Sequence, residues 1–201
     1  MSNAATNAPT SRAALRRHFR AIRRALDDEA QTDHAIAIER HFFTSGLTLA
    51  GRTVGLYVAS DGEPDLEPLR QRLLAARKRV ALPVVRRDGR MEFFRVKRQT
   101  PLVTGRFGIA EPAPGTAYVA PMGIDVLLMP LVAFDDAGNR LGRGAGFYDR
   151  FLGRLPPALR PRLIGVAHEV QHSAQPLPAD DWDVPLHGVL TEAGLRAFHR
   201  R

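Results

Sequence analysis

Three glycines stand at alternate positions within residues 140–150, RLGRGAGFYDR, with an arginine between two of them. Glycine adopts positive φ angles and lets backbone N–H groups come close to an anion, and arginine adds a fixed positive charge. Gly142, Gly144 and Gly146 could therefore cradle a phosphate that Arg143 helps to neutralise. The spacing alone fits an ordinary turn equally well, because it matches neither the Walker A nor the dinucleotide-binding glycine pattern.

Carboxylates follow this loop and recur in two other polar segments. Asp149 comes directly after the glycines, and Asp183 ends the acidic run DDWD, so the two side chains could share a Mg²⁺ ion. In the segment 61–65, DGEPD, the first two residues are typical of a turn and Asp65 is typical of a helix N-cap. Glu63 has no such structural role, which leaves its carboxylate free to accept hydrogen bonds from amino or ring N–H groups of a ligand.

Several familiar catalytic centres are excluded by the residue types. There is no cysteine, which excludes disulfides, thiol nucleophiles and cysteine-bound zinc. No G-x-S-x-G motif provides a serine nucleophile. Among the seven histidines, His168 and His172 are four residues apart, but they flank a predicted strand end and lack a third ligand. We therefore expect neither zinc chemistry nor hydrolysis through an acyl-enzyme.

The elements that must position these residues alternate between helices and strands. Apolar runs predict strands at 53–59, 80–85, 91–96, 124–129, 163–167 and 186–191, and helical spacing predicts helices at 12–26, 33–43, 66–74 and 147–155 and after the last strand. An Asp-Gly turn pairs the second strand with the third as an antiparallel hairpin. The pattern is typical of a three-layer α/β/α fold with a mostly parallel, Rossmann-like sheet. Residues 97–123 are rich in Pro, Gly and Thr, and predict an irregular excursion that is either a mobile lid or fixed.

In such sheets, ligands bind beyond the carboxyl ends of the strands. This places segments 60–63, 131–149 and 168–183 along one edge, where they converge on one site. The length of 201 residues favours a single domain, with residues 1–11 as a flexible tail. We expect a cytoplasmic protein without a membrane partner, because neither a secretory signal nor an apolar run of the roughly 20 residues that span a membrane is present.

Positive charge is concentrated in arginine. The net charge is +8, and Lys78 and Lys97 are the only lysines among the 29 Lys and Arg residues. Ser11 is a typical N-cap for the first predicted helix, and the helical spacing predicts a basic flank of Arg12, Arg16, Arg20 and Arg23 beside the apolar stripe. Arg12 and Arg16 lie near the N-terminus of this helix, where a cation opposes the helix dipole. The usual interpretation is a solvated basic edge. Alternatively, these guanidinium groups bind phosphates, which would relieve the conflict with the dipole.

The arginine-rich helix also raises the alternative of a nucleic-acid-binding protein. Aromatic side chains that stack on bases would then be expected among the arginines. However, aromatic residues make up only 7% of the chain, and Phe19 belongs to the apolar stripe of Leu15, Ile22 and Leu26. A sugar-phosphate isomerase or CoA-transferase-like enzyme on a similar sheet is a further alternative, and it would need no ATP.

The segment 129–150, MPLVAFDDAGNRLGRGAGFYDR, resembles the signature of the 5-formyltetrahydrofolate cyclo-ligase family, also called methenyltetrahydrofolate synthetases. Residues 12–16, RAALR, are similar to the basic-x-x-Leu-Arg opening of that family, and weaker similarity extends to residue 192. Ala145 stands where some members carry lysine, and we expect Arg143 to supply the missing charge.

The resemblance implies an enzyme that converts 5-formyltetrahydrofolate to 5,10-methenyltetrahydrofolate while ATP becomes ADP and phosphate. ATP would phosphorylate the formyl oxygen, N10 would attack the activated carbon, and phosphate would leave. It implies small-molecule substrates as the partners, no nucleic acid and a monomer, with Mg²⁺ at Asp149 and Asp183 and catalytic roles for Arg143 and Tyr148. The implied ATP-binding residues are Arg12, Ala13, Ala14, Leu15, Arg16, Arg140, Leu141, Gly142, Arg143, Gly144, Ala145, Gly146, Phe147 and Tyr148. The implied substrate-binding residues are Val58, Glu63, Arg143, Gly144, Ala145, Gly146 and Phe147.

Overall fold

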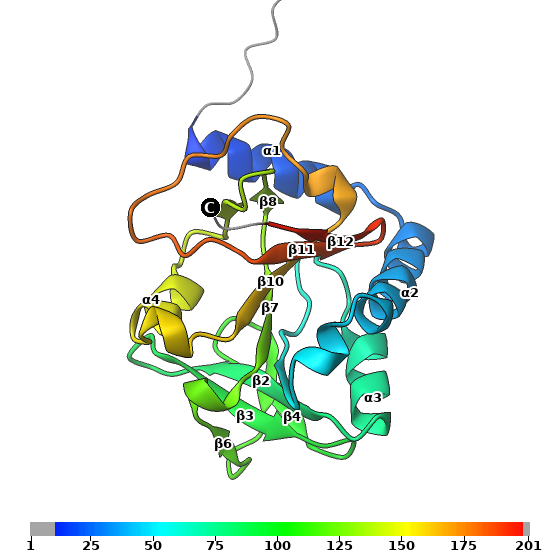
Figure 1. Cartoon of the computed structure of the whole chain (residues 1–201), viewed down its shortest axis with the longest axis vertical. Helices are drawn as coiled ribbons and strands as arrows, with labels where there is room; N and C mark the ends of the chain where they lie inside the picture. The colour runs from blue at the N-terminus through cyan, green and yellow to red at the C-terminus, as the bar shows by residue number, and fades with distance from the viewer. Residues whose placement is uncertain (1–10, 199–201) are drawn as a thin grey trace, which may run out of the picture.

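Apolar segments form the parallel centre of one eight-stranded sheet in the computed structural model, which describes residues 11–198 (Figure 1). In spatial order, the parallel strands are β2 (Arg79–Val85), β1 (Thr53–Gly55), β7 (Val126–Pro130), β10 (Arg162–Val166) and β11 (Gly188–Thr191). The antiparallel edge strands are β3 (Met91–Val96) and β6 (Tyr118–Val119) beyond β2, and β12 (Gly194–Ala197) beyond β11. The predicted, mostly parallel sheet with an antiparallel hairpin is confirmed.

Apolar side chains on both sides of the central strands require a helical layer on each face. In β7, Val126 and Leu128 belong to one hydrophobic cluster, whereas Leu127 and Met129 belong to another, because successive side chains of a strand point to opposite faces. The first cluster is covered by α2 (Asp28–Thr44) and α3 (Glu67–Ala75), and the second by α4 (Phe147–Gly153), as Figure 1 shows.

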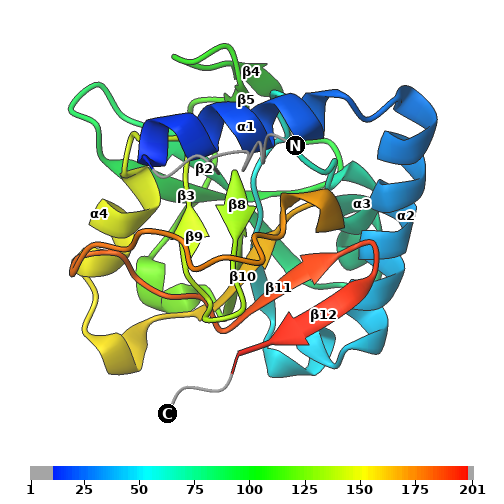
Figure 2. The same cartoon turned by 90° about the horizontal axis from the view of Figure 1, so that it is seen from above.

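Helix α1 (Arg12–Arg24) lies at the carboxyl ends of the strands (Figure 2). It contacts two segments that directly follow strands: β8 (Ala133–Phe134), after β7, and the short helix η4 (Glu169–Gln171), after β10. Its buried residues Leu15 and Phe19 pack in a small hydrophobic cluster with residues of and beside this β8 segment. This packing brings the arginines of α1 beside the strand edge where ligands bind in such sheets.

The order of the strands changes direction between β1 and β7. From β1 the chain continues to β2 on one side, whereas from β7 it continues to β10 and β11 on the other side. Neighbouring loops leave the sheet in opposite directions at such a switch point, which opens a crevice beyond the carboxyl ends of the two strands. Segment 56–63, which follows β1, and the hairpin of β8 and β9 (Arg140–Leu141), which follows β7, border this crevice.

The predicted helix after the last parallel strand is wrong. Residues after Glu192 turn at Gly194, where φ is +133°, and form β12. In β12, residues 194–197 pair antiparallel with residues 188–191 of β11. A free sheet edge offers a hydrogen-bond partner to every second residue, and this outweighs the weak helical preference of a short segment.

Smaller predictions divide between confirmed and wrong. Ser11 caps α1 through a hydrogen bond from Ala14 N to Ser11 Oγ at 3.2 Å, as expected. Asp65 is not the N-cap of α3, which is Leu66; Asp65 Oδ1 instead accepts a hydrogen bond from Glu67 N at 2.9 Å. The predicted tail lies outside the described residues, apart from Ser11.

The remaining short elements are the 3-10 helices η1 (Leu47–Ala50), η2 (Pro121–Gly123) and η3 (Pro157–Leu159) and the hairpin of β4 (Leu102–Thr104) and β5 (Ala110–Pro112). The excursion at 97–123 is therefore less irregular than predicted. Within residues 11–198, we find no helix whose length and apolar character would suit a membrane span.

Candidate active site

A cavity of about 620 Å³ opens beyond the carboxyl ends of β1, β2 and β7, at the switch point of the sheet. This volume suits a small-molecule site, for which roughly 300–1,000 Å³ is typical. The predicted site residues that line it are Arg12, Arg16, Val58, Glu63, Arg140, Gly142, Arg143, Gly144, Ala145, Gly146, Phe147, Tyr148, Asp149 and Asp183. The three polar segments that the sequence placed along one edge therefore meet at one cavity.

The other predicted ATP-binding residues, Ala13, Ala14, Leu15 and Leu141, do not line the cavity. Leu15 and Leu141 are buried in the same hydrophobic cluster beneath α1. The reason is geometric: residues four apart share one face of a helix, so Arg12 and Arg16 face the cavity together while the residues between them do not.

Two of the three glycines in the loop have the positive φ angle that the sequence predicts. Gly144 and Gly146 have φ angles of +105° and +63°, which side chains of L-residues rarely adopt, whereas Gly142 does not have a positive φ. A hydrogen bond from Arg16 Nε to the Gly142 carbonyl oxygen, 2.9 Å long, ties the loop to α1. The loop is thus held against a helix whose arginines face the same cavity.

Arg143 links the glycine loop to the segment after β1. Its Nη2 donates to the carbonyl oxygen and to Oγ of Ser60, at 2.8 and 2.6 Å, and lies 3.0 Å from Glu63 Oε1. Arg143 is itself exposed, and its contacts place a guanidinium group at the wall of the cavity. The charge predicted to replace the lysine of other family members is therefore present at the loop.

Glu63 is a buried carboxylate, and its Oε1 atom is ion-paired but accepts no hydrogen bond from the described residues. Its exposed fraction is 5%, and Oε2 accepts a hydrogen bond from Ser60 N at 3.2 Å. Oε1 lies near Arg143 and is 4.0 Å from Arg23 Nη1, but receives no hydrogen bond from the described residues. Burial raises the pKa of Glu63 and outweighs the opposing charges of Arg143 and Arg23. A buried acceptor without a donor is costly, so a ligand that donates a hydrogen bond here gains affinity.

The two carboxylates predicted to bind Mg²⁺ are both paired with arginines. Asp149 Oδ1 accepts from Nη2 of the buried Arg140, and Asp183 Oδ2 accepts from Nη2 of Arg12, each at 2.5 Å. Burial raises the pKa of Asp183, but the hydrogen bonds from Asp180 N and Arg12 have a larger opposite effect. The pKa of Asp183 is therefore below its usual value. Both groups offer the hard oxygen ligands that Mg²⁺ prefers, on the wall of the cavity that the glycine loop borders.

Apolar and aromatic side chains form the rest of the wall. Phe147 lies 5.5 Å from Phe107 between ring centroids, and Val58 faces the same cavity. Burial raises the pKa of Tyr148, and the negative charge of Glu63 adds a smaller increase. The phenol therefore keeps its proton and can act as a hydrogen-bond donor. The site therefore combines an apolar surface for a flat ring with charged groups for an anion.

A buried ion-pair cluster behind Glu63 was not predicted from the sequence. Asp61 accepts hydrogen bonds from Arg20, Arg23 and Arg24 of α1, and Arg23 is completely buried. The prediction that Arg23 lies on the basic flank is therefore wrong. The signal was present, because Arg23 continues the four-residue spacing of Leu15 and Phe19 into the core.

The fold and the site define a class of protein: an α/β enzyme with a small-molecule cavity of mixed charge at the switch point of its sheet. The model of the 5-formyltetrahydrofolate cyclo-ligase family matches residues 8–192. The chain belongs to the 5-formyltetrahydrofolate cyclo-ligase family.

Individual relatives agree with this assignment. The 5-formyltetrahydrofolate cyclo-ligase of Escherichia coli (strain K12) is 38% identical over 176 residues, which cover 86% of this chain and 96% of the relative. That of Haemophilus influenzae is 35% identical over 180 residues, covering 88% of this chain and 95% of the relative. The structure of Aquifex aeolicus 5,10-methenyltetrahydrofolate synthetase superimposes with a TM-score of 0.83 at 32% identity and covers 94% of each chain. The predicted family and fold are confirmed.

Proposed function

We propose that this chain converts 5-formyltetrahydrofolate to 5,10-methenyltetrahydrofolate, using ATP and releasing ADP and phosphate. Family membership supports the reaction. The site assignment rests on Glu63 Oε1, a buried oxygen that pairs with Arg143 at 3.0 Å but accepts no hydrogen bond from the described residues, in the cavity that also contains the glycine loop. An acceptor for the N–H groups of a pterin and a cradle for phosphates thus share one cavity.

In this proposal, the phosphates of ATP bind between the glycine loop and α1. Within residues 11–198, the only hydrogen bond of the Arg16 side chain is the one from Nε to the Gly142 carbonyl, so both terminal nitrogens are available to phosphate oxygens. Arg143, within the loop, lines the same cavity and can neutralise the phosphoryl group that is transferred. The positive φ of Gly144 supports this arrangement, because such a backbone conformation can direct N–H groups toward an anion. Residues other than glycine adopt this φ only with strain.

The reaction then needs positioning more than a protein nucleophile. The formyl oxygen attacks the γ-phosphorus and ADP leaves with the electrons of the broken P–O bond. N10 attacks the activated formyl carbon, the C–O bond breaks to release phosphate, and the N10 proton is lost. Glu63 and the apolar wall orient the pterin, Arg143 neutralises charge, and Tyr148 donates a hydrogen bond from its protonated phenol. This accounts for the lack of a nucleophile in the sequence.

Asp149 and Asp183 are the residues that would hold Mg²⁺, which neutralises phosphate charge when it is bound. Both carboxylates are already engaged by Arg140 and Arg12. An ion bound by these two groups alone would compete with two arginines, whereas an ion that arrives with ATP brings phosphate oxygens as additional ligands. We therefore favour entry of Mg²⁺ together with ATP over a prebound ion.

The alternatives lose their main support. The arginines of α1 that suggested nucleic-acid binding are largely used inside the protein: Arg23 is buried, and Arg12, Arg20 and Arg24 pair with aspartates. No observation favours a sugar-phosphate isomerase or CoA-transferase-like reaction over the chemistry of the family. A monomeric state and a cytoplasmic location stay predictions.

The test is a spectrophotometric assay of the purified protein with 5-formyltetrahydrofolate, Mg²⁺ and ATP. We expect the absorbance of the methenyl product to appear only when ATP is present, with one ADP formed for each product. A folded protein that forms no product, or forms it at the same rate without ATP, would contradict the proposal.

A further inference from the structure

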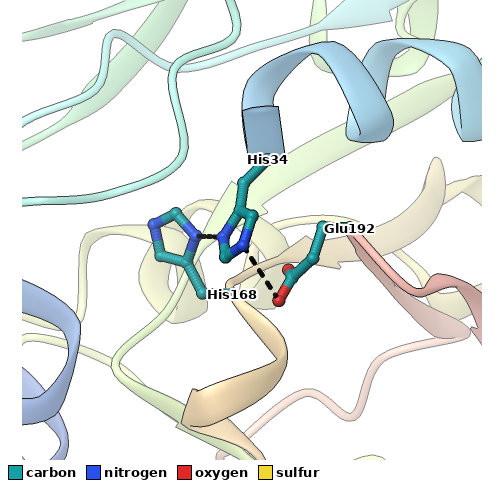
Figure 3. Close-up of side chains that lie close together, drawn as sticks. All are labelled: His34, His168 and Glu192. Atoms are coloured by element: carbon teal, nitrogen blue, oxygen red, sulfur yellow. Dashed lines mark hydrogen bonds and ion pairs between the residues drawn. The ribbon is translucent and has the colours of Figure 1, made fainter. Parts of the chain in front are cut away.

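Two histidines and a glutamate from distant parts of the chain lie close together (Figure 3). His34 comes from α2, His168 precedes η4, and Glu192 lies in the turn between β11 and β12. Nδ1 of His34 is 2.8 Å from Nδ1 of His168, and Nε2 of His34 is 3.6 Å from Glu192 Oε1. One potential ligand atom from each residue lies within 4.8 Å of the others.

The orientation of the His168 ring is fixed by a hydrogen bond at Nε2, the nitrogen that faces away from His34. Nε2 lies 3.1 Å from the carbonyl oxygen of Gly62, and since a carbonyl only accepts, Nε2 must carry a proton. The His168 ring is also completely buried, which favours its neutral form. The lone pair is therefore on Nδ1, which points toward His34. A histidine that binds a metal commonly donates its other N–H group to a backbone carbonyl in this way.

Glu192 is held in place as well. Its two carboxylate oxygens accept hydrogen bonds from Glu169 N, at 3.1 and 3.0 Å. Glu192 and His34 are each 19% exposed at the side chain, so an ion can reach the cluster from solvent. Two imidazole nitrogens and one carboxylate oxygen form a typical donor set for Zn²⁺ and related ions, and water can complete the coordination.

We propose that His34, His168 and Glu192 bind one divalent transition-metal ion of the Zn²⁺ type. Two nitrogens in a tetrahedral zinc site lie about 3.3 Å apart, given Zn–N bonds of about 2.0–2.1 Å. The ion therefore replaces the His34–His168 hydrogen bond, and the His34 ring moves by a few tenths of an ångström or more to offer one nitrogen. The nearby charge of Arg23 does not prevent this, because Asp61 already pairs with it at 2.8 Å.

The site is separate from the proposed chemistry but connected to it. None of the three residues lines the cavity. His168 nevertheless holds the Gly62 carbonyl, and Gly62 directly precedes Glu63. An ion at this position joins α2, the segment after β10 and the β11–β12 turn, and thereby stabilises the segment that carries Glu63. We therefore assign it a structural role rather than a step in the reaction.

The test measures metal binding and stability, which do not depend on catalytic activity. The tag-free full chain is treated with a chelator, exchanged into metal-free buffer, and titrated with Zn²⁺ by calorimetry and with Co²⁺ by visible absorption. We expect one ion per chain, a Co²⁺ spectrum of tetrahedral type, and a higher melting temperature with Zn²⁺. His34→Ala and the nearly isosteric Glu192→Gln should each weaken binding by at least about tenfold.

His18→Ala is the matched control, because His18 is an exposed histidine on α1 outside the cluster, and it should bind the ion as the unmodified chain does. Circular dichroism verifies that each variant is folded, and if His34→Ala does not fold, Glu192→Gln decides the result. Absence of stoichiometric binding to the unmodified chain would overturn the proposal. Equal affinity in the folded cluster variants would overturn it too, since the ion would then lie elsewhere.

Discussion

At the scale of single residues, the structure gives Glu63 a more constrained position than the sequence suggested. The sequence indicated only that Glu63 lacks a structural role. In the structure, Ser60 N binds Oε2 and Arg143 pairs with Oε1, which accepts no hydrogen bond from the described residues. The predicted acceptor role is compatible with this geometry, but the fixing contacts were not predictable, because Arg143 is 80 residues away in the chain.

Replacing Glu63 with glutamine should weaken substrate binding with little change in shape. A hydrogen bond to a charged group contributes about 1.5–3 kcal/mol, so we expect kcat/KM for 5-formyltetrahydrofolate to fall roughly 10- to 100-fold. Steady-state kinetics measures the change, and the KM for ATP should change less. Glu67→Gln on the surface of α3 serves as the control and should leave both constants unchanged.

Glu63 should also set the acid limb of the pH profile. Burial, opposed by Arg143 and Arg23, leaves its pKa above the ordinary value of 4.5. The ionised acceptor is therefore lost as pH falls through a value higher than 4.5, and log kcat/KM should begin to fall there. In Glu63→Gln this limb should disappear; its persistence in the folded variant would assign the limb to another group.

Asp61 should contribute to stability rather than to chemistry. Burial raises its pKa, but hydrogen bonds and charges from Arg24, Arg23 and Arg20 lower it below 3.8. A lowered carboxylate pKa in the folded state stabilises the protein above the ordinary pKa, and this contribution is lost as pH falls below 3.8. We expect Asp61→Asn to cost about 3 kcal/mol, because it leaves the buried Arg23 poorly compensated.

Urea unfolding near neutral pH measures the cost of Asp61→Asn. The matched control is Asp88→Asn, which removes an aspartate–arginine pair on the surface and should unfold like the unmodified chain. Equal stability of the Asp61 and Asp88 variants would show that the buried cluster contributes little.

At the scale of elements, the sequence predicted best where local periodicity and burial agree. The strands 80–85 and 91–96 and the Asp-Gly turn between them are found as β2 and β3, because each follows from its own apolar pattern. The predicted terminal helix was wrong because that segment pairs with the free edge of β11. No local sequence pattern indicates where a sheet has a free edge. Likewise, His34 and His168 meet across 134 positions, which only the packing of α2 on the sheet determines.

The glycine loop allows a comparison between two neighbouring glycines. Gly144 has a φ of +105°, whereas Gly142 does not have a positive φ and an added Cβ there would meet no atom within 4 Å. Alanine in a left-handed conformation costs roughly 1–2 kcal/mol, so Gly144→Ala should raise the KM for ATP roughly 5- to 30-fold. Gly142→Ala should change it much less. Equal effects of the two substitutions would mean that the conformation of Gly144 is not what binds phosphate.

At the scale of the whole molecule, one topological feature assembles the site. The switch between β1 and β7 makes segments around residues 60, 140 and 180 neighbours of the same cavity, and α1 closes it with Arg12 and Arg16. The sequence could predict this convergence, since alternating helices and apolar strands imply carboxyl-end loops on one edge. It could not predict the pairing of Asp149 with Arg140, which depends on side-chain packing inside the assembled loop.

In the proposed reaction, the formyl oxygen receives the phosphoryl group of ATP at this site. The most direct measurement uses 5-formyltetrahydrofolate labelled with ¹⁸O in the formyl group and follows the label by mass spectrometry after one turnover. We expect one ¹⁸O atom in the released phosphate for each methenyl product. Unlabelled phosphate, with the ¹⁸O recovered in water, would contradict it.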